Sequence, residues 1–540
     1  MPILNAQKIT FTLPTGESLF SDISLSIDCK FSAIIGRNGV GKSVLASILA
    51  GKLRPESGQV SQPFEHLGYF SQQSQDIDTE QSIAQFMGVA TTLEAITRIE
   101  SGQYSTEDLT LIGDNWQAGE HLIRALGEIA ITSTLETRYS QLSGGEQAKL
   151  RLLKLFNSKP EFLILDEPSN HMDAISRQWL LSQIKKCRAK VLLISHDRTL
   201  LHHVDIIFEL TSLGLTQYLG NYHHFQTCQQ THLAALERKL TDAHSRQKQL
   251  TRLKQLNLEK AQQRASSGKR LRKSTSQAKV LLNTMRDKAE KSASSRKIQS
   301  GHLLAQNRDT LNQLSLQKES VKPQKLYFQE AEKGIQQKRS CLLSIQALKL
   351  PYTNNPPLNF QLLSGDKLWL SGHNGCGKST LMKVILGNQS SKSGQVYRGA
   401  PLFYLDQHFD LIKPELSLLE HLCHYCLNQP ITQSHTLLAG IGFRGQSVHK
   451  KASKLSGGEK MKLCMLIVSH QTPVPLLLLD EPDNHLDIES KTQLSETLSM
   501  YQGSFILVSH DSQFIKGSVV THTIELTGKE NVEGLTESQR

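Results

Sequence analysis

The sequence lacks long hydrophobic runs, although 38% of its residues are hydrophobic. No apolar stretch approaches the roughly 20 residues that a transmembrane helix needs, so we expect no membrane domain. The N-terminal segment MPILNAQKITFTL has no basic region followed by a long apolar stretch, and we expect no secretory signal. These two absences favour a cytoplasmic protein.

Cysteine is sparse, with eight residues scattered over a chain of 540. This spacing is typical of reduced thiols and argues against a disulfide framework. Cys423 and Cys426 form a CxxC pair, but no second pair follows at zinc-finger spacing. We therefore assign no metal to these thiols.

The chain is too long for one hydrophobic core, and its motifs occur twice. GRNGVGKS at 36–43 is repeated as GHNGCGKS at 372–379. QLSGGEQ, LILDEP and ISHD in the first half return as KLSGGEK, LLLDEP and VSHD in the second. Two such series in the same order indicate an internal duplication.

Each GxxxxGK[ST] motif follows a short apolar strand and precedes a helical pattern, which is the context of a phosphate-binding loop. The glycines let backbone N–H groups point at phosphates, the lysine reaches the β and γ phosphates, and the serine hydroxyl binds Mg²⁺. The predicted loop residues are Gly36, Asn38, Gly39, Gly41, Lys42 and Ser43 in the first copy, and Gly372, Asn374, Gly375, Gly377, Lys378, Ser379 and Thr380 in the second.

Two acidic residues end a continuous apolar run in each copy, as expected for a central parallel strand. We expect Asp166 and Asp480 to meet the hydration shell of Mg²⁺. Glu167 and Glu481 are then placed to orient or deprotonate the attacking water. His196 and His510, here termed the switch histidines, follow further apolar strands and are expected to contact the γ-phosphate.

Residues 231–325 carry 22 Lys or Arg against 7 Asp or Glu, a net charge of +15. The whole chain has a net charge of +11, so the rest carries about −4. Leucines at three- and four-residue steps from Leu233 to Leu253 predict a helix, and a second apolar edge from Leu281 to Leu314 predicts its antiparallel partner.

The leucine stripe breaks around 266–276, where we predict the tip of the hairpin. Four basic residues gather there: Lys269, Arg270, Arg272 and Lys273. A solvated spacer is the plain alternative, but a spacer normally mixes both signs of charge. The cluster favours contact with an RNA backbone, without base-specific recognition.

The spacing between repeated motifs changes once. Gln72 and Gln407 lie 335 residues apart, whereas the next pair of motifs lies 313 apart. The first copy therefore has 22 additional residues, which we expect to form a small helical insertion near 75–125.

These motifs together resemble the ATP-binding cassette superfamily. The resemblance implies two P-loop NTPase cassettes that pack head to tail, so that each ATP lies between one P-loop and the other cassette's LSGG signature. It assigns nucleotide contacts to Ser143, Gly144, Gly145, Ser456, Gly457 and Gly458, and to Gln72 and Gln407. Tyr352 is a candidate for stacking on adenine in the second site, and Phe11 is a weak one in the first.

Two cassettes without a membrane domain, the sequences SNHMD and DNHLD after the paired acids, and a basic helical linker resemble the F subfamily, ribosome-associated translation factors. The resemblance implies binding of the ribosome, with the linker directed towards rRNA, P-site tRNA and the peptidyl-transferase region. Some members protect ribosomes from antibiotics, and others rescue or regulate translation.

The predicted fold is therefore α/β, with a first cassette at 1–225, a basic helical-hairpin linker at 226–325 and a second cassette at 326–540. We expect a monomeric ATPase that uses ATP and Mg²⁺ and pairs its cassettes within one chain. An ATPase subunit that energises a membrane transporter is the main alternative, and a DNA-handling ATPase is a weaker one.

Overall fold

The structure is a computed structural model of the whole chain. The residues that it describes are 3–14, 16, 18–71, 80–103, 105–170, 172–273, 299, 301–314, 340–353, 355–406, 411–426, 430–443, 445–455, 457–471, 473–484 and 486–527. The chain divides into two compact units, one formed by Met1–Tyr222 with Pro323–Arg540 and the other by His223–Lys322.

The first cassette is built on a six-stranded sheet with the order β5-β6-β7-β3-β8-β9. All neighbours pair in parallel except β8 and β9, which form an antiparallel edge. Every residue of β3 and β6 is buried, because a parallel sheet is covered on both faces. The strands are β3 (Phe31–Ile35), β5 (Leu67–Phe70), β6 (Phe162–Asp166), β7 (Lys190–Ile194), β8 (Ile206–Thr211) and β9 (Gly214–Leu219).

A smaller antiparallel sheet of β1 (Leu4–Thr12), β2 (Ser18–Ile27) and β4 (Ser57–Ser61) belongs to the same cassette. Helix α1 (Lys42–Leu49) presents Leu45, Ile48 and Leu49 to a core shared with both sheets. This packing fixes the N-terminal end of α1 beside the carboxyl ends of the parallel strands.

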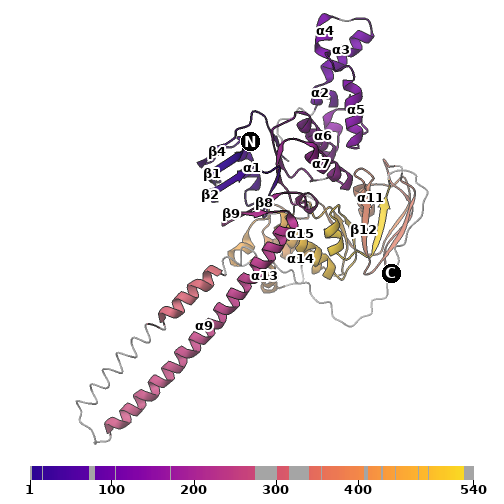
Figure 1. Cartoon of the computed structure of the whole chain (residues 1–540). Helices are drawn as coiled ribbons and strands as arrows, with labels where there is room; N and C mark the ends of the chain where they lie inside the picture. The colour runs from indigo at the N-terminus through magenta and orange to yellow at the C-terminus, as the bar shows by residue number, and fades with distance from the viewer. Residues whose placement is uncertain are drawn as a thin grey trace. The chain divides into compact units, whose positions relative to one another are not determined.

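Four helices occupy the stretch in which the first copy is longer, and α3 and α4 lie at the far end of a projection from the sheet (Figure 1). An ion pair between Arg98 and Asp108 ties α3 to α4. The helices are α2 (Ile83–Met87), α3 (Ala90–Glu100), α4 (Thr106–Ile112) and α5 (Ala118–Glu128). The matching part of the second cassette holds α12 (Leu418–Tyr425), α13 (Ile431–Gly440) and the 3₁₀ helix η2 (Gly445–His449).

The second cassette repeats the design. Its five-stranded parallel sheet has the order β14-β15-β16-β12-β17, and its antiparallel sheet has the order β11-β10-β13. The strands are β10 (Cys341–Lys349), β11 (Leu358–Leu363), β12 (Lys367–Gly372), β13 (Ser393–Arg398), β14 (Leu402–Leu405), β15 (Leu476–Asp480), β16 (Phe505–Val508) and β17 (His522–Leu526). The duplication and the α/β cassette fold predicted from the sequence are confirmed.

The remaining helices of each cassette also have counterparts in the other copy, with α11 corresponding to α1. In the first cassette they are η1 (Tyr139–Gln141), α6 (Gly144–Asn157), α7 (Ala174–Lys186) and α8 (Arg198–Leu201). In the second they are α11 (Lys378–Leu386), η3 (Ala452–Lys454), α14 (Gly457–Ser469), α15 (Ile488–Met500) and α16 (Ser512–Gly517). Within the part of the chain that is described, no helix is both long and apolar enough to span a bilayer.

The described part of the linker includes the 52-residue helix α9 (Tyr222–Lys273) and a helical segment at 301–314. Leu240 and Ala243 of α9 form an apolar cluster with Leu311, and the Asn307 side chain donates a hydrogen bond to the Ala243 carbonyl at 3.0 Å. These contacts hold the two helical segments together, as the apolar edges predict.

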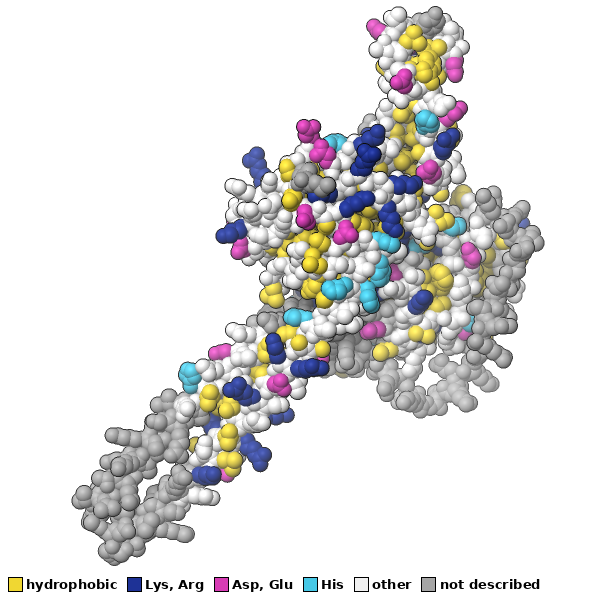
Figure 2. All heavy atoms as spheres, viewed as in Figure 1, with side chains coloured by type: hydrophobic (Ala, Val, Ile, Leu, Met, Phe, Trp, Pro, Cys, Tyr) yellow, Lys and Arg dark blue, Asp and Glu magenta, His cyan; other side chains and the backbone are white. Residues whose placement is uncertain are grey.

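The prediction that the basic cluster at 269–273 lies at a turn is wrong. Helix α9 continues to Lys273, so the backbone of the basic cluster at 269–273 is helical and does not form a turn. Gly268 does not end the helix, because one glycine costs a helix only about 1 kcal/mol relative to alanine. The side chains of Lys269, Arg270, Arg272 and Lys273 lie outside the described part of the structure. Figure 2 shows further basic side chains along the described length of α9.

Candidate active site

The phosphate-binding loop of the first cassette ends where α1 begins. Gly41 is the N-cap residue of this helix and has a φ of 101°, which favours glycine. A Cβ atom at Gly36 would lie 2.3 Å from the Leu210 carbonyl oxygen, so a side chain is excluded there as well. The backbone N–H groups of the loop therefore lie at the N-terminus of a helix. The helix dipole is positive at this end, so anions bind there.

Lys42 is the first residue of α1, and its Nζ donates hydrogen bonds to the carbonyls of Gly36 and Arg37 at 2.8 and 3.0 Å. Burial lowers the pKa of this ammonium group, and the negative charge of Glu167 opposes that decrease. Lys378 has the same position in α11 and donates to Gly372 and His373 at 2.8 and 2.9 Å. Ser43, Ser379 and Thr380 follow these lysines in the first turn of each helix.

Asp166 and Asp480 are the last residues of β6 and β15. Burial raises the pKa of both carboxyl groups, and hydrogen bonds with Ser43 and Ser379 oppose the rise. Asp166 Oδ1 is buried and has no hydrogen-bond partner among the described residues. An inward carboxylate oxygen beside a serine hydroxyl fits the surroundings of a Mg²⁺ ion with its water ligands.

Glu167 and Glu481 have φ values of 49° and 51°, a backbone conformation that is uncommon for residues other than glycine. Their N–H groups donate to the carbonyls of Ile194 and Val508 at 2.8 and 2.9 Å, which anchors each residue to the neighbouring strand. Burial raises the pKa of both carboxyl groups to about 7. Such strained, buried acids are typical of catalytic positions.

Each switch histidine lies close to the glutamate of its own cassette. His196 Nε2 is 3.5 Å from Glu167 Oε1, and His510 Nε2 is 3.8 Å from Glu481 Oε1. Burial lowers the pKa of both rings, well below the usual value for His196 and to about 4 for His510. Both histidines are therefore neutral at physiological pH.

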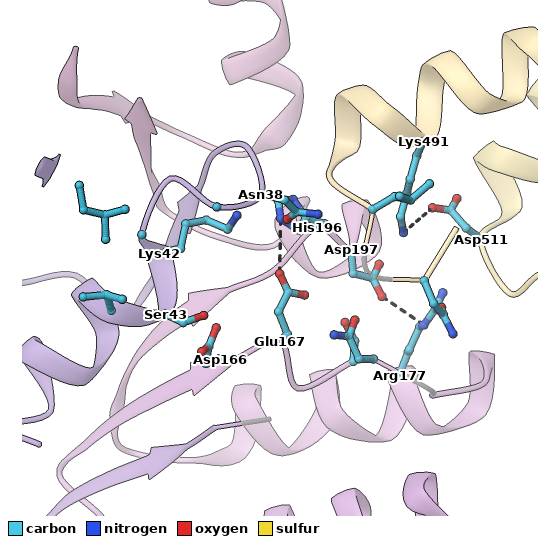
Figure 3. Close-up of a pocket in the computed structure, with 18 of the residues that line it drawn as sticks. Asn38, Lys42, Ser43, Asp166, Glu167, Arg177, His196, Asp197, Lys491 and Asp511 are labelled. Carbon is cyan, nitrogen blue, oxygen red and sulfur yellow. Dashed lines mark hydrogen bonds and ion pairs between the residues drawn. The ribbon is translucent and has the colours of Figure 1, made fainter. Parts of the chain in front are cut away.

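A cavity of about 460 Å³ opens in front of the first P-loop (Figure 3). Lys42, Ser43, Asp166, Glu167 and His196 all line it, so the predicted catalytic and phosphate-binding side chains of the first cassette converge on one space. Its wall also includes four residues of the second cassette: Asn484, Leu486, Lys491 and Asp511. The cavity is therefore shared by both cassettes.

The contact region between the cassettes, here called the seam, contains two matching hydrogen bonds. The backbone N–H of Asn38 donates to Asp487 Oδ2 at 3.1 Å, and that of Asn374 donates to Asp173 Oδ2 at 3.3 Å. Asp173 and Asp487 also cap the N-termini of α7 and α15. Each P-loop is thus joined to the segment that follows the predicted catalytic glutamate of the other cassette.

The signature motifs lie at helix starts. Ser143 is the N-cap of α6, in a capping box with Glu146, and Gly144 and Gly145 form the first turn. Gly457 and Gly458 begin α14. Three predicted nucleotide contacts, Ser456, Gln72 and Gln407, lie outside the described residues.

The two adenine-stacking candidates differ in their surroundings. Phe11 is partly buried and packs against the core beside Phe20, with ring centroids 6.3 Å apart. Leu13 and Leu19 line the cavity of the first site instead. Tyr352 is 90% exposed and has a φ of 61°.

Four charged residues at the seam were missed by the sequence analysis: Arg177, Asp197, Lys491 and Asp511. All four line the cavity, where Figure 3 shows Asp197 paired with Arg177 and Lys491 with Asp511. The repeat offset of 314 residues relates Arg177 to Lys491 and Asp197 to Asp511. This repetition of charge in both copies is the sequence signal that could have identified these four residues.

The chain matches the ABC transporter family at residues 20–170 and 356–484. It is 28% identical to ABC transporter F family member 5 of Arabidopsis thaliana, over 91% of this chain and 70% of that protein. It is 29% identical to the probable ATP-binding protein YheS of Haemophilus influenzae, over 90% of this chain and 73% of that protein. These relatives confirm the resemblance to the F subfamily.

Among solved structures, the fold is similar to that of the archaeal ribosome recycling factor aABCE1, crystallised with the ribosomal stalk protein aP1. The TM-score is 0.54 at 16% identity, and the alignment covers 96% of this chain and 87% of aABCE1. Two matched segments, a repeated set of P-loops and buried acids, and a cavity shared across the seam lead to one conclusion. The chain is an ATPase of the ABC transporter family and carries two ATP-binding cassettes.

Proposed function

We propose that the chain is an ATP-driven clamp that associates with ribosomes through its basic linker. ATP binding closes the two cassettes at the seam, and hydrolysis lets them separate and release the RNA. The cavity shared by both cassettes supports the clamp, because a nucleotide bound there would contact both halves at once.

In each proposed site the P-loop residues bind the phosphates. The N–H groups of Gly36, Asn38, Gly39 and Gly41, with the Lys42 ammonium, surround the β and γ phosphates in the first site. The matching residues from Gly372 to Thr380 do the same in the second. Ser143 then contacts the nucleotide bound at Lys378, and Ser456 the one bound at Lys42.

Ser43 with Asp166 and Ser379 with Asp480 would hold Mg²⁺, the serine hydroxyl directly and the carboxylate through water. A bound Mg²⁺ would neutralise charge that develops on the β and γ phosphates. The buried, unpaired Oδ1 of Asp166 supports this assignment in the first site.

Glu167 and Glu481 act as general bases towards the attacking water. A carboxyl pKa of about 7 makes each group a stronger base than an exposed glutamate while leaving it substantially ionised at neutral pH. The neutral switch histidines, 3.5 and 3.8 Å from these carboxylates, orient the same water and the γ-phosphate.

The observation that carries the ribosomal assignment is the separation of charge. Residues 231–325 hold a net +15, whereas the remainder of the chain holds about −4. A helical segment with such an excess of positive charge fits an RNA backbone, and Lys269, Arg270, Arg272 and Lys273 are its proposed contacts. We place the linker near P-site tRNA and rRNA, and the chain in the cytoplasm as a monomer, as the resemblance of its motifs to the F subfamily implies. Protection from ribosome-targeting antibiotics is a finer possibility within this role.

The experiment that tests the assignment traps the closed state. Glu167→Gln with Glu481→Gln removes both bases, so the variant should bind ATP without turning it over. After incubation of cell extract with ATP, we expect this variant to co-sediment with ribosomes. Recovery with membranes would support the alternative of a transporter subunit, and recovery with DNA would support a DNA-handling ATPase.

A further inference from the structure

Arg198 begins α8, two residues after the switch histidine His196. The helix has four residues, and its N-cap is Asp197, whose side chain accepts a hydrogen bond from the Thr199 N–H at 2.9 Å. A movement of the His196 loop must therefore carry the base of the Arg198 side chain with it.

The Arg198 guanidinium crosses the seam. Its Nη2 donates to Thr492 Oγ1 at 2.8 Å and to the Ile488 carbonyl at 3.5 Å, both in α15 of the second cassette. Its Nη1 donates to the Gln513 side chain in α16. A guanidinium has several donors in one rigid plane, so one side chain can satisfy several acceptors at once.

The same guanidinium is hydrogen-bonded to the hydroxyl of Tyr222, the first residue of linker helix α9. Tyr222 is 6% exposed, and its ring packs edge-on against His202, the C-cap of α8, with centroids 5.6 Å apart. Both ends of α8 therefore contact the residue at which the linker begins.

The second cassette has no such arginine. The offset of 314 residues relates Arg198 to Ser512, whose side chain is too short to reach across a seam. This difference between the cassettes agrees with where the linker is attached, because α9 begins only 24 residues after Arg198 of the first cassette.

We propose that Arg198 is a positioning residue that couples closure of the first ATP site to the linker helix. It is not among the residues that line the cavity of the first site. In the closed state it is held by Thr492 and Gln513, and in that position it fixes Tyr222 and the start of α9. When the cassettes separate, the bonds to the second cassette are lost and Tyr222 loses its fixed partner. This coupling rests on the proposed clamp and states how closure of the cassettes is transmitted to the linker.

A two-state coupling of this kind requires that ATP favour one arrangement of Tyr222 over the other. Hydrogen exchange at the amides that follow Tyr222 reports that difference without any ribosome. The full-length chain with Glu167→Gln and Glu481→Gln serves as parent, with and without ATP, and peptides covering 222–240 are followed by mass spectrometry.

In this parent we expect ATP to slow exchange in these peptides about tenfold, the effect of one charge-assisted hydrogen bond. Tyr222→Phe removes only the hydroxyl, and Thr492→Val removes one of the three acceptors that hold Arg198 across the seam. Tyr222→Phe should abolish the ATP-dependent slowing and Thr492→Val should reduce it, while each variant still binds ATP and, with both glutamates intact, still turns it over.

Thr227→Val is the matched control, because the Thr227 hydroxyl bonds to the His223 carbonyl within α9. It should keep the ATP-dependent slowing. Arg198→Lys retains the charge with fewer directed donors, and we expect it to retain less than half of the effect.

Slowing that persists unchanged in both Tyr222→Phe and Thr492→Val would overturn the proposal. Because no ribosome is present, this result is separate from the sedimentation experiment. Coupling could be found in a chain that does not bind ribosomes, and in that case only the proposed ribosomal role would fall.

Discussion

Arg177 of the first cassette donates a hydrogen bond from Nη1 to the backbone carbonyl of His510, the switch histidine of the second cassette, at 3.0 Å. Its Nε lies 3.2 Å from Asp197 Oδ2, beside the switch histidine of its own cassette. The side chain is only 15% exposed. One guanidinium thus joins the loops that carry both switch histidines.

This bridge predicts that Arg177→Met lowers the kcat for ATP about tenfold and changes KM less than twofold, because Arg177 orients the loops and is not among the predicted phosphate contacts. Arg177→Lys should recover part of the loss, since Lys491 occupies the matching place and pairs with Asp511 at 3.4 Å. Steady-state ATPase assays measure both constants.

The control is Lys186→Met, at the exposed end of the same helix α7. It should leave both constants unchanged. A rise in KM with unaltered kcat in Arg177→Met would place this residue in nucleotide binding and contradict the bridge.

The second prediction concerns pH. The glutamates have pKa values raised by burial to about 7, and each must be ionised to accept a proton. As pH falls through 7 these carboxylates become protonated, so kcat/KM should fall about tenfold per unit below about 6.5 and level off above about 7.5. His510, with a pKa of about 4, stays neutral over this range.

Initial rates between pH 5.5 and 8.5 at constant ionic strength test this, with circular dichroism to verify that the chain stays folded. A profile that is flat down to pH 5.5 would show that a raised glutamate pKa does not govern turnover. The variant with both glutamines should show only a small residual rate at every pH.

The third prediction separates the two sites. Because Asp487 accepts the Asn38 N–H of the first P-loop, Asp487→Ala should impair the first site more than the second. In a Glu481→Gln background, where only the first site turns over, we expect a loss of more than tenfold. In a Glu167→Gln background the loss should be less than threefold.

Asp173→Ala should give the reverse pattern, because Asp173 accepts the Asn374 N–H. Each change also removes a helix cap and should cost about 1 kcal/mol of stability, which thermal unfolding detects. Equal losses of activity in both backgrounds would indicate that the substitution damages the fold and does not act through a contact across the seam.

The fourth prediction concerns the linker charge. Replacing Lys269, Arg270, Arg272 and Lys273 with Ala should weaken ribosome association and reduce its salt dependence, while ATPase activity without ribosomes persists. The control replaces four exposed bases of the first cassette, Lys8, Lys52, Arg54 and Lys186. If the control variant loses association equally, binding depends on total charge and not on the linker.

The sequence predicted the structural positions of the motif residues in each cassette, because each motif is contiguous in the chain. Lys42 follows directly from a glycine-rich loop before a helix, and Asp166 from the end of a buried strand. The strained backbone of Glu167 could not be predicted, because its positive φ depends on a hydrogen bond to Ile194 in a neighbouring strand.

The contacts at the seam could not be predicted for the same reason, because they join residues that are distant in the sequence. The partners of Arg177 and Arg198 across the seam lie 290 to 333 residues away, so no local sequence pattern predicts them. The basic cluster was wrongly placed at a turn because the turn was inferred from a lost leucine stripe. Helix α9 persists through Gly268 to Lys273 without that stripe, since helix formers such as Lys and Arg fill its last turns.

The most direct test of the account asks which nucleotide is lost when one signature serine is blocked. Ser143→Arg in the trapped Glu167→Gln, Glu481→Gln chain places a bulky side chain where the other cassette's nucleotide is proposed to bind. Photoreactive 8-azido-ATP followed by peptide mapping locates the bound nucleotides. We predict two per chain in the parent, and in the variant the loss of the one beside Lys378 with retention of the one beside Lys42. Loss beside Lys42, or retention of both, would contradict a nucleotide shared between the cassettes.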